Sequence, residues 1–464
     1  MVVKSPEMRI PWKPIKMYCF RILFCVFGVA LLVIHLLSSI RYSSYRAVVD
    51  PSFNVIEAIG ELNKNIAAKP DHDKTIVANM KDDEAFPNES FQNRNDDMID
   101  DNKVQEFTRN NKGNADTYAT TTTAEKIEAS KEEVQHIAFL KVHKAASSTA
   151  QNIFLRFGWK RNLTFVLSPA KNPAGYPNII SLRESLTNSN ILRPPPGKHY
   201  DILCNHVFYN YNAFRQFMPK DTKFIGIVRE PFELYKSILN YFKPRYIFKM
   251  IQGPHPASQF LRDPAKYEPK GKSSNSWTRS RMAIEYGFPE ELFKKYDKAA
   301  SEKYLEKIGH EFTMVIIAEY FEDSVVMMRR LLRWQTKDIL FVNLNVARHK
   351  DESELTKAYD RDFYRNYAKL DYDIYNFFYR RLREQIREEG QDFDDELLAF
   401  KELRKRVQEF CALPAAEKAQ PLEIPKTSWG EQFAIGIEEC KDMTSGEISF
   451  ITRIRVRQYG SRDI

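Results

Sequence analysis

The sequence predicts an α/β fold with a central parallel sheet flanked by helices. Short apolar runs typical of buried strands recur from His136 onward, and segments with helical spacing follow several of them. Strands that alternate with helices form parallel sheets with both faces covered. The runs expected as strands are residues 137–142, 200–204, 223–228 and 312–318.

The helical segments have less uniform signals than the strands. The expected helices are residues 148–157, segments that begin at Pro231 and Phe321, and long charged helices within residues 352–410. At the end of the chain, residues 448–457 alternate between apolar and polar side chains, which predicts a strand. Three arginines of this tail, Arg453, Arg455 and Arg457, would then form a row on one strand face, exposed to solvent or available to an acidic acceptor.

Composition excludes several classes of protein. The chain has 464 residues, of which 43% are hydrophobic and 28% charged, so it is long enough for a substantial core. Sixteen glycines and 23 prolines are too few for a collagen-like or low-complexity chain. The net charge of +8 suits anionic partners without selecting nucleic acid over phosphate, sulfate or acidic glycans.

The N-terminal part predicts a membrane anchor. Residues 22–40 form an apolar run of 19 residues without Lys, Arg, Asp or Glu, which is long enough to cross a bilayer. Five basic residues precede the run, against a single Glu7, so residues 1–21 are expected as a cytoplasmic tail of a type II membrane protein. The alternative is a cleaved secretory signal, which the length of the run and the poor cleavage site disfavour.

The segment after the anchor predicts a disordered lumenal stem over residues 41–134. It is acidic, rich in Asn and poor in branched aliphatic residues, so it cannot bury enough apolar surface to fold. Asn88 lies in one N-glycosylation sequon, and Asn162 lies in another within the folded part. Residues 135–464 are then expected as one lumenal domain.

Cysteine usage fits an oxidising compartment. Cys411 and Cys440 flank a proline-containing segment and are expected to form a disulfide, whereas Cys204 is expected to stay reduced in a strand. The spacing of Cys and His residues matches no zinc motif, so no metal site is expected.

The loop after the first strand is a candidate phosphate-binding loop. In the string FLKVHKAASST, residues 139–149, Lys144 and several hydroxyls precede a helix, where free N–H groups and the helix dipole attract phosphate. The loop lacks both glycines of the G-x-x-x-x-G-K-[ST] motif, which disfavours a nucleoside triphosphatase or kinase. Taken alone, the pattern also fits a capped helix start with a solvated lysine.

A second candidate element follows the third expected strand. Arg229 stands at the carboxyl end of residues 223–228, which is the edge where open α/β sheets bind ligands. Its guanidinium is suited to a bidentate phosphate contact, and Ser237 on the following helix is suited to add a hydroxyl. A structural Arg before Pro231 is the alternative interpretation.

Together these two elements resemble the sulfotransferases that use 3′-phosphoadenosine 5′-phosphosulfate (PAPS). The strings FLKVHKAASSTAQNI, RFG, RNLT, DILCNHV, FLRDP and LLRW are similar to the galactose-3-O-sulfotransferase family over roughly residues 136–380. The resemblance implies a P-loop NTPase-like sulfotransferase fold and a Golgi type II membrane enzyme. It also implies that the first loop holds the 5′-phosphosulfate, while Arg229 and Ser237 hold the 3′-phosphate.

Two positions depart from the family pattern. Ala145 and Ala146 follow Lys144 where the family usually has Thr and then Gly or Ala, which removes one hydroxyl. Asn205 stands where the family tends to have another His. Both departures leave the loop lysine and His206 in place, so they put the choice of acceptor in doubt more than the activity.

The resemblance implies roles for particular residues. His206 is expected as the general base that contacts the acceptor, and Lys144 as the residue that stabilises the leaving phosphate. His143 either orients the loop or contacts the cofactor, and Arg279 is a candidate contact for acceptor or nucleotide. The full set expected to bind PAPS is Lys141, His143, Lys144, Ala145, Ala146, Ser147, Ser148, Thr149, Arg229 and Ser237.

The function implied is transfer of a sulfuryl group from PAPS to the 3-hydroxyl of galactose on a glycolipid of the galactosylceramide type or on a glycoprotein glycan. No metal is expected, because Lys and Arg side chains neutralise the phosphate charge. No nucleic acid partner is expected either. A uronyl or heparan-type 2-O-sulfotransferase and an inactive glycan-binding member of the family are the alternatives. The sequence does not indicate an oligomeric state.

Overall fold

The computed structural model describes residues 132–169, 172, 175–343, 356–357 and 360–460. The predicted anchor at residues 22–40, almost all of the predicted stem and the sequon at Asn88 lie outside the described residues. Within the described part of the chain, no helix combines the length and the apolar character needed to cross a membrane.

A four-stranded parallel sheet organises the fold and has the strand order β2-β1-β3-β4. The register pairs Ile137 with Ile202 between β1 and β2, and Ile225 with Met314 between β3 and β4. A separate antiparallel pair, β5 and β6, lies near the C-terminus. The strands are β1 (Ile137–Phe139), β2 (Ile202–Leu203), β3 (Lys223–Val228), β4 (Met314–Ile317), β5 (Leu422–Ile424) and β6 (Phe433–Ile435).

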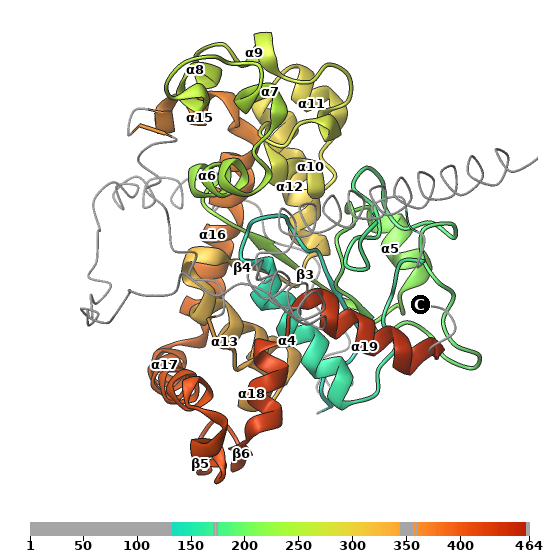
Figure 1. Cartoon of the computed structure of the whole chain (residues 1–464), viewed down its shortest axis with the longest axis vertical. Helices are drawn as coiled ribbons and strands as arrows, with labels where there is room; N and C mark the ends of the chain where they lie inside the picture. The colour runs from blue at the N-terminus through green and yellow to red at the C-terminus, as the bar shows by residue number, and fades with distance from the viewer. Residues whose placement is uncertain (1–131, 170–171, 173–174, 344–355, 358–359, 461–464) are drawn as a thin grey trace, which may run out of the picture. The chain divides into compact units, whose positions relative to one another are not determined.

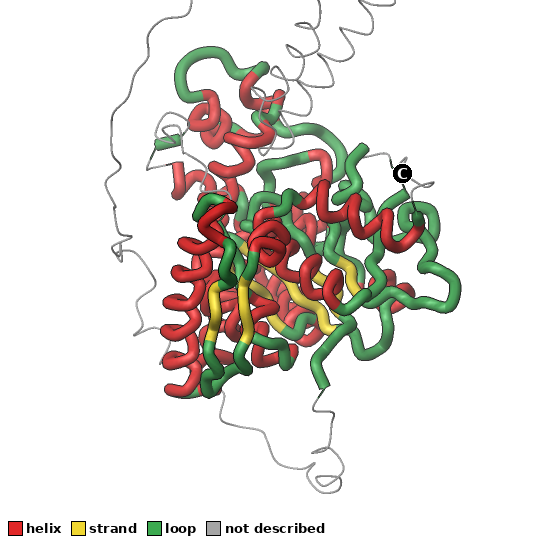
Figure 2. The backbone as a smooth tube through the Cα atoms, turned by 60° about the horizontal axis from the view of Figure 1, so that its bottom comes forward, coloured by secondary structure: helices red, strands yellow, loops and turns green. Residues whose placement is uncertain are grey.

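Helices surround this sheet (Figures 1 and 2). They are α4 (Ser147–Lys160), α5 (Tyr211–Phe217), α6 (Pro231–Phe242), α7 (Arg245–Phe248), α8 (Pro256–Arg262), α9 (Pro264–Tyr267), α10 (Arg281–Glu285), α11 (Glu290–Lys294), α12 (Lys298–Glu311), α13 (Phe321–Leu332), α14 (Thr336–Ile339), α15 (Asp360–Tyr367), α16 (Lys369–Glu389), α17 (Gln391–Ala412), α18 (Ile437–Thr444) and α19 (Glu447–Tyr459).

The core lies between the sheet and its helices. All residues of β1 are buried, and Phe139 stacks on Phe154 of α4 with ring centroids 4.7 Å apart. On the same helix, Phe157 stacks on the buried Trp334 at 3.7 Å. Burial of an aromatic side chain stabilises a fold by about 1.5–3 kcal/mol, so these contacts hold α4 firmly behind the loop that precedes it.

The structure confirms the predicted α/β architecture and its parallel sheet. β3 and the starts of α6 and α13 lie where the sequence predicts them, and the long charged helices are α16 and α17, preceded by the shorter α15. The first two strands are shorter than predicted: β1 ends at Phe139, although the Leu140 N–H still donates to the Ile225 carbonyl, and β2 contains only Ile202 and Leu203. The residues that follow them form the loops of the candidate site.

The predicted strand at residues 448–457 is wrong, because this segment is helical and forms most of α19. Its buried residues Phe450, Ile451 and Ile454 follow a helical period and face the core beside α4. The three arginines therefore form no row. Arg453 pairs with Asp442, the buried Arg455 donates to the Ser168 carbonyl, and Arg457 donates to the Trp159 carbonyl.

Cys411 and Cys440 form a disulfide that joins α17 to α18. Cys204 is a buried free thiol directly after β2. Asn162 is exposed in the turn after α4, and its sequon partner Thr164 is buried.

Candidate functional site

The loop between β1 and α4 wraps the carboxyl end of β1. Lys144 and Ala146 have positive φ angles of 61° and 59°, a backbone conformation that costs non-glycine residues roughly 1–2 kcal/mol. Ser147 is buried and donates from Oγ to the Val142 carbonyl at 2.5 Å, which closes the loop. The exposed Ser148 and the half-buried Thr149 follow in the first turn of α4, whose free N–H groups favour an anion.

Lys144 and Arg229 meet at this loop from neighbouring strands. Arg229 follows β3 and donates from Nη1 to the Lys144 carbonyl at 3.0 Å. The Lys144 ammonium lies 3.7 Å from the ring centroid of Tyr241 on α6. Burial and the nearby Arg229 lower the pKa of Lys144 to about 8. Two cationic side chains held this close create a site for an anion.

Ser237 lies half-buried in the second turn of α6. It precedes Tyr241 by four residues, so the two side chains lie on the same helix face. Because Tyr241 contacts Lys144, that face of α6 is turned toward the loop between β1 and α4. The structure therefore brings Ser237 and Arg229 to the same side of the sheet as Lys144.

Lys141 is almost fully buried and forms an ion pair with Glu447 of α19. The same carboxylate accepts from Ser148 Oγ at 3.3 Å and from Asn178 Nδ2 at 2.8 Å. Burial raises the pKa of Glu447, but Lys141 and Ser148 outweigh it and hold that pKa below its usual value. No sequence signal points to Glu447, because it lies 306 residues from Lys141 and directly precedes the segment predicted as a strand.

His206 and His143 stack face to face at the carboxyl ends of β2 and β1. Their ring centroids are 3.6 Å apart and their planes differ by 15°. His206 Nδ1 lies 2.9 Å from the Lys141 carbonyl, which is an acceptor only, so Nδ1 carries the proton and the Nε2 lone pair is left as a base. Burial, His143 and Lys141 hold the pKa of His206 well below its usual value, which keeps the ring neutral.

Glu285 orients His143. Its carboxylate accepts from His143 Nδ1 at 2.6 Å and from the His143 backbone N–H at 2.9 Å. Arg281 lies one helical turn before Glu285 and donates to the same carboxylate at 2.6 Å. Although burial would raise it, His143 and Arg281 lower the pKa of Glu285 to about 2. The spacing of Arg281 and Glu285 predicts their own pairing, but no sequence signal connects them to His143.

His143, His206 and Glu285 have the composition of a divalent-cation site as well as of a proton-transfer site. Their ligand atoms lie within 4.8 Å of one another. Trp277 borders this cluster, with its ring edge-on to His143 at 5.4 Å and the Arg281 guanidinium 4.3 Å from its ring centroid.

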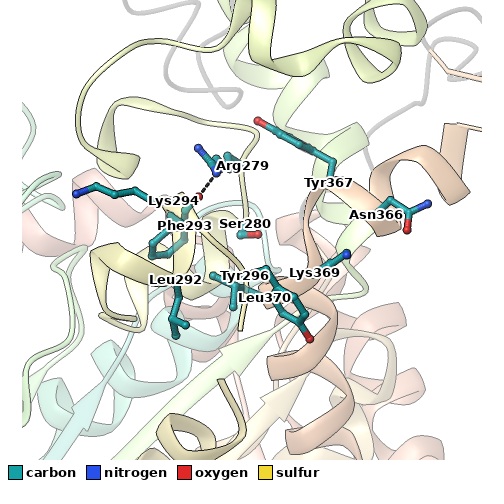
Figure 3. A pocket seen from close by; sticks show the side chains of 10 residues that line it. All are labelled: Arg279, Ser280, Leu292, Phe293, Lys294, Tyr296, Asn366, Tyr367, Lys369 and Leu370. Atoms are coloured by element: carbon teal, nitrogen blue, oxygen red, sulfur yellow. Dashed lines mark hydrogen bonds between the residues drawn. The ribbon is translucent and has the colours of Figure 1, made fainter. Parts of the chain in front are cut away.

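Arg279 lies in the wall of a separate pocket of about 220 Å³ (Figure 3). Its guanidinium donates to the Phe293 carbonyl, and the role expected for it toward acceptor or nucleotide stays a prediction. Arg281, two residues further on, contacts the histidine cluster through Glu285. The pocket is lined by Arg279, Ser280, Leu292, Phe293, Lys294, Tyr296, Asn366, Tyr367, Lys369 and Leu370.

Comparison with known proteins identifies related sequences over the same region. A family model described as galactose-3-O-sulfotransferase matches residues 106–420. Galactose-3-O-sulfotransferase 2 of Mus musculus is 32% identical over 287 residues, which are 60% of this chain and 70% of the relative. Galactosylceramide sulfotransferase of Homo sapiens is 28% identical, and the alignment covers 60% of this chain and 64% of the relative. Galactose-3-O-sulfotransferase 3 of Mus musculus is 29% identical over 59% of this chain and 63% of its own length, so the matched region spans under two thirds of these last two proteins.

Proposed function

Because this chain belongs to the galactose-3-O-sulfotransferase family, a family of PAPS-dependent enzymes, we propose that it sulfates the 3-hydroxyl of galactose. The acceptor is a glycolipid of the galactosylceramide type or a glycoprotein glycan. The observation that supports this most directly is the stacked pair of His143 and His206 beside a cationic loop at the start of α4. The histidine pair is suited to take a proton, and the cationic loop is suited to bind an anion.

The donor binds at the β1–α4 loop in this proposal. The N–H groups at the start of α4, Ser148 and Thr149 contact the 5′-phosphosulfate, and Lys144 contacts the phosphate oxygen that leaves. Arg229 and Ser237 contact the 3′-phosphate, a group that ATP lacks, so these contacts would make the site select PAPS over ATP. We also propose that the fold is the P-loop NTPase-like sulfotransferase fold. The position of the β1–α4 loop directly after the first strand of a parallel sheet supports this.

The transfer step is a direct displacement at sulfur. The galactose 3-oxygen attacks the sulfur atom, the bond between sulfur and the bridging phosphate oxygen breaks, and His206 Nε2 takes the hydroxyl proton. The products are the 3-sulfated galactoside and 3′-phosphoadenosine 5′-phosphate (PAP). General-base assistance contributes about 10²- to 10⁴-fold to such a rate. Lys144 stabilises the negative charge that grows on the leaving phosphate, so the chemistry requires no metal ion.

The test is sulfate transfer by the purified full-length protein from PAPS labelled with radioactive sulfate. The acceptors are galactosylceramide, a lactose-terminated glycan and a uronate-containing glycan, and the variants are His206→Ala and, as a matched control, His310→Ala at an exposed site on α12. We expect label on the galactose 3-position, loss of transfer in His206→Ala and normal transfer in His310→Ala.

Other outcomes separate the alternatives. Label on the uronate acceptor alone identifies a uronyl 2-O-sulfotransferase. Binding of PAP without transfer to any of the three acceptors supports the nucleotide site and contradicts the proposed acceptor. Failure to bind PAP at all contradicts the proposal.

We also propose that residues 22–40 anchor the protein in the Golgi membrane with residues 135–464 in the lumen. The apolar run and its basic flank support this topology. Endoglycosidase treatment tests it, because glycans at Asn88 or Asn162 form only on lumenal segments. Equal mass loss from the parent protein and the Asn162→Gln variant contradicts glycosylation at Asn162.

A further inference from the structure

A second cluster of ligating side chains lies at the amino ends of β1 and β2, whereas the candidate site lies at the carboxyl ends of the strands. His136 directly precedes β1, and Asp201 directly precedes β2. The register that pairs Ile137 with Ile202 brings these two residues to neighbouring positions, and His199 lies two residues before Asp201. His143, His206 and the loop between β1 and α4 lie at the carboxyl ends of the same strands. The length of the strands therefore separates the new cluster from the candidate site.

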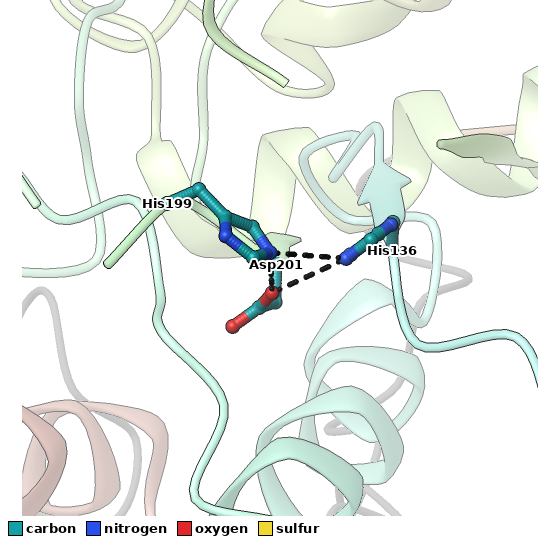
Figure 4. Close-up of side chains that lie close together, drawn as sticks. All are labelled: His136, His199 and Asp201. Carbon is teal, nitrogen blue, oxygen red and sulfur yellow. Dashed lines mark hydrogen bonds and ion pairs between the residues drawn. The ribbon is translucent and has the colours of Figure 1, made fainter. Parts of the chain in front are cut away.

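Three ligand atoms converge in this cluster (Figure 4). His136 Nε2 lies 3.2 Å from His199 Nε2 and 3.4 Å from Asp201 Oδ1, and His199 Nε2 lies 2.9 Å from the same oxygen. Zinc binds imidazole nitrogen and carboxylate oxygen at about 2.0–2.1 Å, so ligand atoms at tetrahedral angles around it are separated by about 3.3 Å. The observed separations are close to that value, and a zinc ion therefore fits against all three atoms.

Neighbouring groups hold two of these ligands in place. His136 Nδ1 lies 2.8 Å from Asp221 Oδ1, so the carboxylate accepts the Nδ1 proton and directs the Nε2 lone pair into the cluster. A carboxylate behind a histidine is the usual support of a metal-binding imidazole. Asp201 Oδ2 accepts from the Thr164 backbone N–H at 2.6 Å, which leaves Oδ1 for the cluster.

The surroundings favour an ion with an open coordination position. The His199 side chain is 66% exposed, while those of His136 and Asp201 are 25% and 12% exposed. An ion can therefore enter from solvent and keep a water molecule as its fourth ligand.

From this geometry we propose that His136, His199 and Asp201 bind a divalent transition-metal ion of the zinc type, with Asp221 as a positioning residue. The ion joins the amino ends of β1 and β2 through their side chains, and Asp221 links it to the turn before β3. It stabilises the sheet without taking part in sulfuryl transfer, so the inference does not depend on the proposed function.

Zinc titration of the metal-free full-length protein tests this proposal by calorimetry, with Co²⁺ as a spectroscopic substitute. We expect one high-affinity zinc ion per chain, visible Co²⁺ absorption of a four-coordinate site and a rise in Tm on binding. His199→Ala changes an exposed side chain, so it should leave the fold intact while it weakens zinc binding at least about 10-fold. Asp221→Asn should weaken it about 10- to 100-fold.

Two variants serve as controls. His310→Ala changes an exposed histidine outside the cluster and should bind zinc like the parent protein. His206→Ala removes a ligand of the other candidate cation cluster and should also retain the high-affinity ion. Equal zinc affinity in the parent protein and His199→Ala, loss of the ion in His206→Ala alone, or no zinc binding at all would each overturn the proposal. In that case the three side chains form only a hydrogen-bonded group.

Discussion

The His143 and His206 rings stack 3.6 Å apart, although 63 residues separate them in the chain. Each ring donates from Nδ1 to a fixed oxygen, His143 to the Glu285 carboxylate and His206 to the Lys141 carbonyl. Both Nε2 atoms are therefore left as bases. Two imidazoles in such contact cannot both carry a positive charge at low cost, so the pair holds at most one proton beyond its neutral state.

The first prediction separates the two histidines. His206→Ala should lower kcat by about 10²- to 10⁴-fold with little change in the KM for PAPS, because it removes the proposed base. Glu285→Gln should lower kcat by a smaller factor, because it acts only through the orientation of His143. In a His143→Ala background, Glu285→Gln should then have little further effect. Steady-state kinetics of the parent protein and these four variants provide the measurement, and a larger kcat loss in His143→Ala than in His206→Ala would reverse the assignment.

The second prediction concerns Lys144 and pH. Because its pKa is lowered to about 8, the ammonium loses its proton as the pH rises through 8, while an anionic ligand binds the charged form. Affinity for PAP should therefore change little around pH 7, where the phosphates of PAP are largely ionised, and fall about 10-fold per pH unit above pH 8. Lys144→Arg keeps the charge throughout this range and should remove the dependence. Calorimetric titration with PAP at several pH values tests this, and identical profiles in both proteins would refute it.

The third prediction concerns the ion pair of Lys141 and Glu447. Glu447→Gln leaves the buried Lys141 ammonium without its partner and should lower the free energy of unfolding by about 3–5 kcal/mol at most. Lys141→Met leaves a carboxylate that is 27% exposed, so it should lower the free energy of unfolding by less. The double variant should lose less than the sum of the two single losses. Urea denaturation of the full cycle measures the coupling, and strictly additive losses would mean that the pair contributes nothing of its own.

The fourth prediction follows from Asp371, a fully buried residue on α16. Its carboxylate accepts from the Ala283 backbone N–H at 2.9 Å, and burial raises its pKa to about 7. A raised pKa means that the folded state holds a proton that the unfolded state releases above about pH 4. The free energy of unfolding should therefore fall between pH 4 and 7 by up to about 1.4 kcal/mol per pH unit from this group.

Asp371→Asn tests that dependence, because the amide oxygen still accepts the same hydrogen bond and does not titrate. We expect the variant to lose less stability than the parent protein between pH 5 and pH 7 in urea denaturation. Parallel pH profiles for the two proteins would show that Asp371 does not titrate in the folded state.

Local patterns were sufficient to predict the sheet and its main loop. An apolar strand, a polar loop and a helix with one apolar face lie within residues 137–160, so their order along the chain already implies a binding loop at the end of β1. The same holds for Arg229 at the end of β3. The strand predicted for residues 448–457 was wrong because the apolar residues there fit a period of two nearly as well as a helical period. Only the packing of α19 beside α4 distinguishes the two periods.

The sequence alone therefore established the α/β class, the carboxyl-edge loop with Lys144, and His206 as a candidate base. Tertiary packing decided the contacts between residues distant in the chain. Glu285 contacts His143, Glu447 pairs with Lys141, and His199 and Asp201 lie beside His136. The reason is physical. Periodicity and motifs report on neighbours within a few residues, whereas these contacts depend on strand register and on helices packed from 63 to more than 300 residues away.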